Sequence, residues 1–125
     1  YGVENTLQWT SFQEFHLQAE YTYVVSEKNK AENFYQPKHR LFLNPQIMPK
    51  EKLELQIPIS FRSSAQGFSE TMPAYWDISP KLITRYKNYS AFFQIRNLLE
   101  QRQIENEGFP LPEERNYLLS LQYQF

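Results

Sequence analysis

Hydrophobic and polar residues alternate with a period of two along much of this sequence. The clearest case is the final run, Asn116–Phe125, in which every second residue from Tyr117 onward is large and apolar and the residues between are mostly polar. A period of two places the two sets on opposite faces of a β-strand. About ten residues with aromatic side chains near both ends have the length of a membrane-spanning strand. A half-buried strand of a soluble sandwich shows the same alternation.

Six further segments alternate in a similar way and are predicted to be strands. They are residues 1–9, 13–25, 39–48, 52–62, 75–86 and 89–97. Three prolines, Pro45, Pro58 and Pro80, lie inside these segments. Because proline has no N–H to donate to a neighbouring strand, we expect bulges or strand breaks at these positions. The sequence therefore predicts an all-β chain of about seven strands.

Charged residues occupy only one face of the clearest predicted strands. The apolar face holds no Asp, Glu, Lys or Arg, and the opposite face holds Glu20, Arg40, Glu54, Arg62, Asp77, Lys81, Arg85 and Arg96. An Arg or Lys on the lipid face at mid-bilayer costs about 2–4 kcal/mol, a penalty that a soluble sheet does not face at its strand ends. The segregation favours a transmembrane barrel wall with lipid on one side and a polar interior on the other.

The predicted connections alternate between short and long. Short turns are expected near residues 10–12, 49–51 and 87–88, and long loops at residues 26–37, 63–73 and 98–115. An antiparallel up-and-down barrel in an outer membrane has short periplasmic turns and long extracellular loops. A long loop precedes the last strand, so this strand is predicted to run inward and to end at the periplasmic side.

Composition excludes several other classes of protein. The net charge of −1 over 125 residues argues against a nucleic-acid partner. The mean hydropathy of −0.67 argues against membrane-spanning helices. The absence of cysteine excludes thiol chemistry. His16 and His39 are predicted to lie on opposite faces, and no serine has an oriented histidine beside it, so we expect no metal site, no cofactor and no catalytic residues.

Several short motifs resemble the C-terminal end of TonB-dependent outer-membrane receptors. Ile95–Leu99 is similar to the family's N-L-(F/L) motif after the penultimate strand, and Gly108–Arg115 is similar to its G-Y-P-x-P-G-R loop, with Glu113 and Glu114 where the family usually has glycine. The run Tyr35–His39 resembles the family's P-x-H motif, and the last strand ends on an aromatic residue, Phe125. The order and spacing of these motifs carry the resemblance.

The resemblance implies that residues 1–125 are about the last seven strands of a roughly 22-stranded barrel. Such receptors lie in the bacterial outer membrane and take up a scarce nutrient, such as a ferric siderophore, haem or cobalamin, with energy relayed by TonB. We therefore expect the remaining strands and the plug domain to lie outside this chain, with TonB reached through the plug. The resemblance also assigns the last strand to recognition by the barrel-assembly machinery, through Tyr117, Leu119, Leu121, Tyr123 and Phe125.

Four charged residues near the predicted outer strand ends are candidates for binding the nutrient: Arg40, Arg62, Asp77 and Arg96. Guanidinium groups bind anionic ligands through charge-assisted hydrogen bonds. The same residues have a purely structural interpretation, in which they pair with carboxylates of the barrel interior or plug. Two other architectures stay open at this point, namely a free-standing eight-stranded outer-membrane barrel, structural or lipid-modifying, and a soluble all-β binding domain.

Overall fold

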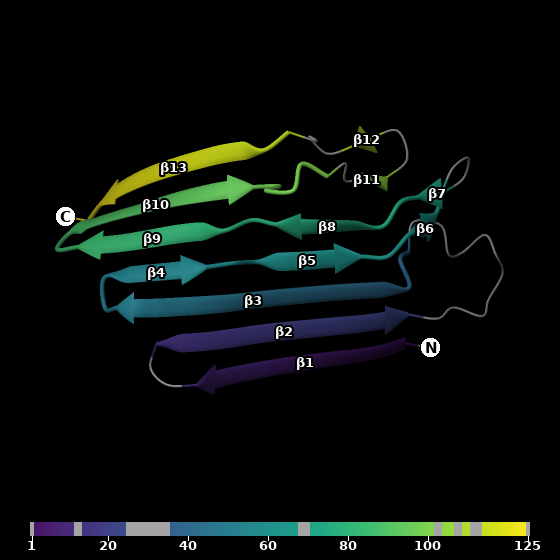
Figure 1. Cartoon of the computed structure of the whole chain (residues 1–125), viewed down its shortest axis with the longest axis horizontal. Coiled ribbons are helices and arrows are strands. Elements are labelled where there is room, and N and C mark those ends of the chain that lie inside the picture. The colour runs from purple at the N-terminus through teal and green to yellow at the C-terminus, as the bar shows by residue number, and fades with distance from the viewer. Residues whose placement is uncertain are drawn as a thin grey trace.

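In the computed structural model, the chain forms an antiparallel sheet in which neighbouring strands mostly follow one another in sequence (Figure 1). The structure describes residues 2–11, 14–24, 36–67, 71–101, 104–106, 109–110 and 114–124. The main sheet has nine strands. They are β1 (Gly2–Ser11), β2 (Phe15–Val24), β3 (His39–Lys50), β4 (Leu53–Gln56), β5 (Ile59–Arg62), β8 (Tyr75–Ile78), β9 (Lys81–Tyr86), β10 (Tyr89–Arg96) and β13 (Asn116–Tyr123).

Two pairs of these nine strands are halves of longer strands. Strand β3 pairs with β4 through Gln46 and Gln56, and with β5 through Leu43 and Ile59. The register does not shift between these two pairs, so β4 and β5 continue one another along β3. In the same way, β4 opposes β9 while β5 opposes β8. The sheet is therefore a meander of seven strands in the order β1, β2, β3, β4–β5, β8–β9, β10 and β13, which confirms the predicted strand count.

Prolines explain where the two long strands are interrupted. The carbonyl groups of Pro45, Pro58 and Pro80 accept backbone hydrogen bonds of 3.0 Å from Ile57, Ser79 and Ile95 on the neighbouring strands. No proline can donate a bond in return, so three successive strand pairs each lose one ladder hydrogen bond at nearly the same height in the sheet. The predicted breaks are confirmed at Pro58 and Pro80. At Pro45 the prediction was wrong, because β3 runs through it to Lys50 and has its register shift between Ile47 and Lys50.

The connections separate the sheet into two ends (Figure 1). At one end lie the connections β1–β2, β3–β4 and β9–β10, which we call the short-turn end; Lys87 adopts a left-handed φ of 51° in the last of them. At the other end, the long-loop end, two regions predicted as loops contain two-stranded hairpins. These are β6 (Ala65–Gln66) with β7 (Thr71–Met72), and β11 (Ile104–Asn106) with β12 (Phe109–Pro110). The last described strand, β13, ends at the short-turn end, as predicted.

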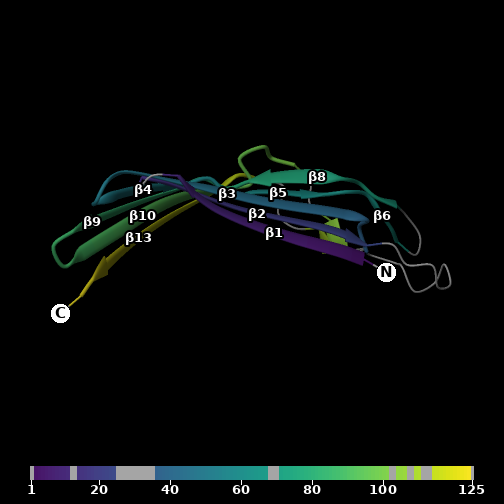
Figure 2. The same cartoon turned by 90° about the horizontal axis from the view of Figure 1, so that it is seen from below.

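The sheet is a single curved layer (Figure 2). Among the described residues, the only buried hydrophobic side chains are Ala65, Met72 and Tyr75. Leu119 and Leu121, which would be core residues in a soluble sandwich, are 67% and 78% exposed. The described residues thus leave unpartnered the apolar surface that a soluble domain would bury against a second layer.

Strand register gathers the apolar side chains on one side, which we call the apolar face. It consists of the odd-numbered residues of β1, β2, β4, β5, β10 and β13, the odd-numbered residues of β3 up to Ile47, and the even-numbered residues of β8 and β9. Beyond the register shift in β3, Lys50 opposes Leu53 at the short-turn border of this face. For example, Leu82 opposes Leu55 on one side and Phe93 on the other, and Phe93 opposes Leu119. None of the residues of this face is Asp, Glu, Lys or Arg. The predicted charge segregation therefore holds across the whole width of the sheet.

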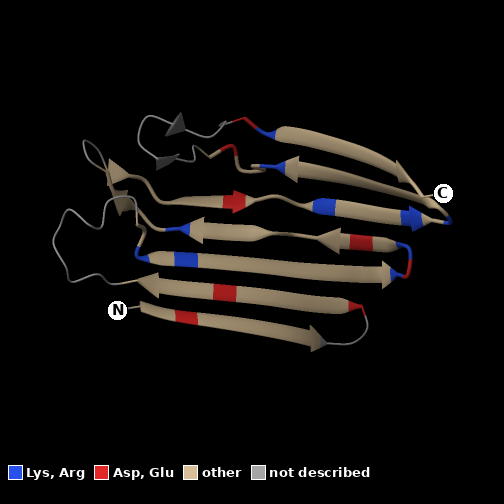
Figure 3. Ribbon diagram, turned by 180° about the vertical axis from the view of Figure 1, so that it is seen from behind, with Lys and Arg blue, Asp and Glu red and all other residues tan. Residues whose placement is uncertain are grey.

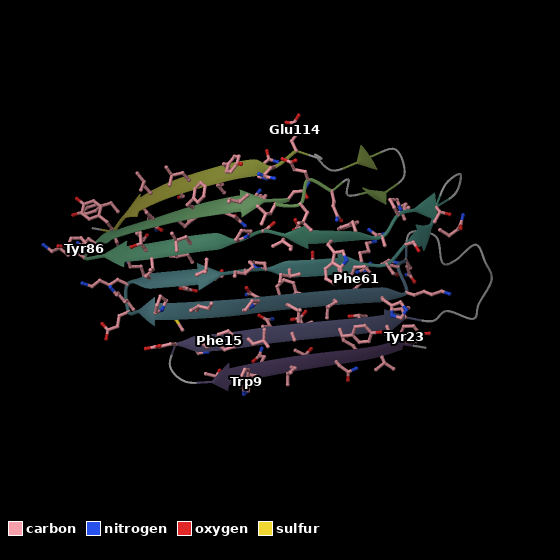
Figure 4. All side chains as sticks on the ribbon, in the orientation of Figure 1. Trp9, Phe15, Tyr23, Phe61, Tyr86 and Glu114 are labelled. Atoms are coloured by element: carbon pink, nitrogen blue, oxygen red, sulfur yellow. The ribbon has the colours of Figure 1, made fainter. Side chains whose placement is uncertain are left out.

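Aromatic side chains mark both ends of the apolar face (Figure 4). At the short-turn end, the rings of Trp9 and Phe15 lie 5.8 Å apart and those of Tyr89 and Tyr123 lie 4.8 Å apart. At the long-loop end, Tyr23 stacks on His39 at 4.9 Å, and the rings of Phe61 and Trp76 lie 4.6 Å apart. Two aromatic bands with aliphatic residues between them are the pattern of a barrel surface that crosses a bilayer.

Candidate functional site

The opposite side of the sheet, which we call the polar face, carries all eight charged residues that the sequence analysis assigned to a barrel interior. Figure 3 shows where the charged residues lie along the strands. The register confirms the shared face for all eight, since each alternates with apolar-face residues of its own strand: Glu20, Arg40, Glu54, Arg62, Asp77, Lys81, Arg85 and Arg96.

Charges near the short-turn end of the polar face are matched within the chain. Arg85 Nη1 lies 3.1 Å from Glu54 Oε2, and Gln56 Nε2 donates a hydrogen bond to the other carboxylate oxygen of Glu54. The ammonium group of Lys81 lies 4.4 Å from the ring centroid of Phe92, a cation–π distance. These contacts fit the structural interpretation of Lys81 and Arg85, in which charges stabilise a polar interior.

Two of the four predicted ligand-binding residues are direct neighbours at the long-loop end. Arg40 of β3 opposes Arg62 of β5, which places two arginines opposite each other on the polar face. Like charges that face each other across a strand pair repel. Such a pair favours an anion in contact with both residues. Arg40 also borders a hollow of about 310 Å³ that Glu4 and Thr22 help to line.

Asp77 lies close to this arginine pair. It opposes Ser60 of β5, so it is diagonal to Arg62 on the adjoining strand. Its carboxylate accepts hydrogen bonds of 3.1 Å at both oxygens from the hydroxyl group of Ser79. Arg96 opposes Asn116 on one side. On its other side, between the backbone hydrogen bonds Ile95–Pro80 and Leu98–Ile78, it lies across from Ser79, whose hydroxyl group donates to Asp77. The structure thus places Arg62 and Arg96 on the two strands that flank Asp77, with Arg40 opposite Arg62.

A hydrogen-bond network behind Asp77 was not predicted from the sequence. The Ser79 hydroxyl oxygen accepts a bond from the backbone N–H of Asn97 at 3.3 Å. Asn97 is only 5% exposed and has a left-handed φ of 51°. Its amide group donates to the carbonyl of Gln101 and accepts from the Gln101 N–H, both at 3.1 Å. The Gln101 side chain in turn accepts the N–H of Trp76 at 2.8 Å.

This network bends the chain after β10. The N–H of Leu98 donates to the carbonyl of Ile78 at 2.9 Å, so the segment 97–101 continues along β8 where β10 has ended. Asparagine tolerates a left-handed φ better than most residues, which explains its presence at this position. Asn97 belongs to the motif Ile95–Leu99 that resembles the receptor family, and this motif was the one sequence feature that pointed to the residue. Asp77 therefore has a structural contact, and its role toward a ligand stays a prediction.

The two histidines lie on opposite faces, as predicted. Thr10 Oγ1 lies 3.1 Å from His16 Nδ1 on the polar face, whereas the Tyr21 hydroxyl lies 2.8 Å from His39 Nδ1 on the apolar face. Within the described ranges, no three His, Cys, Asp or Glu side chains are grouped in a way that suits a metal ion. The same ranges contain no helix that is long and apolar enough to cross a membrane.

The predicted assembly-signal residues form the apolar face of β13. Tyr117, Leu119, Leu121 and Tyr123 oppose Ile95, Phe93, Ala91 and Tyr89 of β10 and are largely exposed. Phe125 lies outside the described residues. In the described part of the chain β13 pairs with β10 alone, and β1 pairs with β2 alone, so the sheet has one edge at each of these strands.

A single-layer antiparallel meander with one apolar face and one charged face is the architecture of a β-barrel wall. No protein-family model matches the sequence, and no curated protein matches it. By structure, the chain is similar to the ferric enterobactin receptor PfeA, solved in complex with BCV-L6, with a TM-score of 0.78 over 96% of this chain at 18% sequence identity. The predicted fold class, an all-β meander that matches a segment of a TonB-dependent receptor barrel, is thereby confirmed.

The match also gives the scale of the fragment. The chain spans 22% of the length of the matched receptor chain. Seven strands correspond to roughly a third of a 22-stranded wall, so the described sheet covers only part of a barrel of that size.

Proposed function

We propose that this chain is part of an outer-membrane receptor that takes up a scarce nutrient by active transport driven through TonB. The observation that carries the proposal is the apolar face, which is free of Asp, Glu, Lys and Arg across seven strands and is bounded by aromatic bands at both ends. Hydrocarbon requires such a surface, whereas water does not. The structural similarity to a segment of a receptor barrel supports the same conclusion.

The proposal includes four kinds of partner. The edges at β1 and β13 require further strands, because unpaired backbone groups are not tolerated in a bilayer. Those strands and a plug domain complete the receptor, and TonB acts through the plug. Outer-membrane lipid covers the apolar face, and the barrel-assembly machinery recognises the last strand through Tyr117, Leu119, Leu121, Tyr123 and Phe125. The proposed location is the bacterial outer membrane.

The proposed ligand is anionic, in keeping with a ferric siderophore or a similar chelate. Arg40 and Arg62 oppose each other at the long-loop end, where a ligand arriving from outside first meets the wall. Charge-assisted bonds from two guanidinium groups are strong and directional. Asp77 and Arg96 are the further candidates at this end, Asp77 by holding the neighbouring segment and Arg96 by adding positive charge.

Measuring the uptake of radioactive iron tests this function. The iron is supplied as each of a panel of ferric siderophores, to cells with and without TonB. We expect uptake of at least one chelate that disappears without TonB. The double variant R40Q/R62Q is expected to lower its apparent affinity about a hundredfold or more, since hydrogen bonds to charged groups contribute about 1.5–3 kcal/mol each. The matched control R40K/R62K keeps both charges and should retain part of the affinity. Uptake that is the same without TonB would refute active transport.

A further inference from the structure

Tyr86 is flanked by two lysines at the short-turn end of the sheet. Its ring centroid lies 5.4 Å from the ammonium group of Lys52, in the β3–β4 turn, and 5.5 Å from that of Lys87, in the β9–β10 turn. Tyr86 itself is 59% exposed and belongs to the apolar face. The Tyr86 ring is therefore within cation–π range of one lysine from each of two turns, at the short-turn border of the apolar face. Figure 4 labels Tyr86 at this end.

A groove on the apolar face begins beside this cationic pair. Tyr86, Tyr89 and Tyr123 lie in one row across β9, β10 and β13, and the next row inward is Thr84, Ala91 and Leu121. Because threonine and alanine are small while the tyrosines are large, the surface is hollowed, with a volume of about 290 Å³. The groove is lined mainly by apolar atoms, and three tyrosines are among the residues that line it.

The described charged residues in the three short connections are Glu14, Glu51, Lys52 and Lys87, and Lys50 is the last residue of β3 beside the second connection. Arg85 is already paired with Glu54 on the polar face. Lys52 and Lys87 therefore place two positive charges beside Tyr86, which also lines the apolar groove.

We propose that this feature binds an anionic phospholipid of the inner leaflet. Its phosphate lies between the Lys52 and Lys87 ammonium groups, and one acyl chain lies in the groove over Ala91. The proposal rests on the membrane placement given under the proposed function, which puts the short-turn end at the periplasmic side. That side distinguishes the ligand from lipopolysaccharide, which occupies the opposite leaflet. Tyrosine hydroxyl groups at the rim suit the headgroup region, as interfacial tyrosines do.

Retention of defined lipids by the purified full-length protein tests the proposal. The protein is placed in nanodiscs of phosphatidylethanolamine with a small fraction of phosphatidylglycerol, and the lipids that stay bound after detergent extraction are counted by native mass spectrometry. We expect enrichment of phosphatidylglycerol. The double variant K52Q/K87Q should lower the enrichment about fivefold per lysine, which corresponds to roughly 1 kcal/mol for each basic residue near an anionic surface.

Two further variants separate the headgroup from the acyl chain. K50Q removes the lysine at the end of β3, beside the turn that holds Lys52. Lys50 has no cation–π contact with Tyr86, so its replacement should leave the enrichment unchanged. Ala91→Leu fills the groove and should lower retention of both lipids while preserving the preference between them. Heat-modifiable mobility in gels verifies that each variant is folded.

The outcomes distinguish this proposal from the one on which it rests. Equal retention of the two phospholipids by the unmodified protein, a preference for lipopolysaccharide, or no effect of K52Q/K87Q would each overturn the lipid site and leave the transport function standing. Failure of the unmodified protein to enter the bilayer would overturn the membrane placement itself.

Discussion

Two adjacent leucines of β13 provide the sharpest test of the face assignment. Leu118 lies on the polar face opposite Gln94, and Leu119 lies on the apolar face opposite Phe93. The two residues have the same side chain and the same strand, and both lie near its middle. Replacing each of them by arginine therefore changes only which face receives the charge.

The expected order of the two effects depends on what surrounds the sheet. In a bilayer, an arginine on the lipid face near the midplane costs about 2–4 kcal/mol. Leu119→Arg should therefore lower the free energy of unfolding by about that amount, and Leu118→Arg, which faces a wet interior, by less than about 1 kcal/mol. In water the order reverses. Leu119 is 67% exposed and Leu118 only 38%, so Leu118→Arg would lose more of the roughly 1.5–3 kcal/mol that burying a leucine contributes.

The assay is guanidinium unfolding of the full-length protein in lipid vesicles, followed by tryptophan fluorescence. Folding into vesicles in vitro avoids the assembly machinery, so a defect in recognition of the last strand does not enter the result. Gln122→Arg, on the polar face of the same strand, serves as a second control. If Leu118→Arg destabilises the protein more than Leu119→Arg does, the reasoning about the two faces is wrong.

Three further predictions concern single contacts of the sheet. Asn97→Ala should lower the free energy of unfolding by about 2–3 kcal/mol, because it loses the left-handed preference and two hydrogen bonds. Asn97→Gly, which keeps the backbone conformation, should lower the free energy of unfolding by less. The temperature of the heat-modifiable transition measures both effects. Pro58→Thr restores a donor toward the Ser79 carbonyl and should gain about 0.5–1.5 kcal/mol, with slower amide exchange at Ser79; an unchanged or lower stability would contradict this. Glu54→Gln should cost less than about 1 kcal/mol, because Arg85 is exposed to the wet interior, and the loss should shrink in 1 M salt; a loss independent of salt would contradict this interpretation.

The faces of the strands could be predicted from the sequence because alternation is a local property. Side chains of an extended chain point to opposite sides whatever the strand pairs with. Leu55 and Glu54, for instance, lie on opposite sides in every sheet that contains them as a strand. The interruptions at Pro58 and Pro80 were predictable for a similar reason, since the missing N–H is a property of the residue itself.

The candidate site could be predicted only in part. The sequence placed Arg40, Arg62 and Asp77 on one face near one end, and the structure brings them together. The bonds from Ser79 to Asp77 and Asn97 were not predicted, because they join residues whose proximity depends on where β10 leaves the sheet. Arg96 was grouped with the other three on strand position alone, and the pairing of strands places it across from Ser79, the partner of Asp77.

By itself, the sequence determined the strands, their two faces and the segregation of charge, because these follow from a two-residue period and from the chemistry of each side chain. Tertiary structure alone decided the register. Register makes Arg40 a neighbour of Arg62, pairs the aromatic rings at both ends, and brings Lys52 and Lys87 to the same tyrosine from turns far apart in the chain. A period of two is unchanged when a strand slides by two residues, so alternation cannot specify which residues meet across a strand pair.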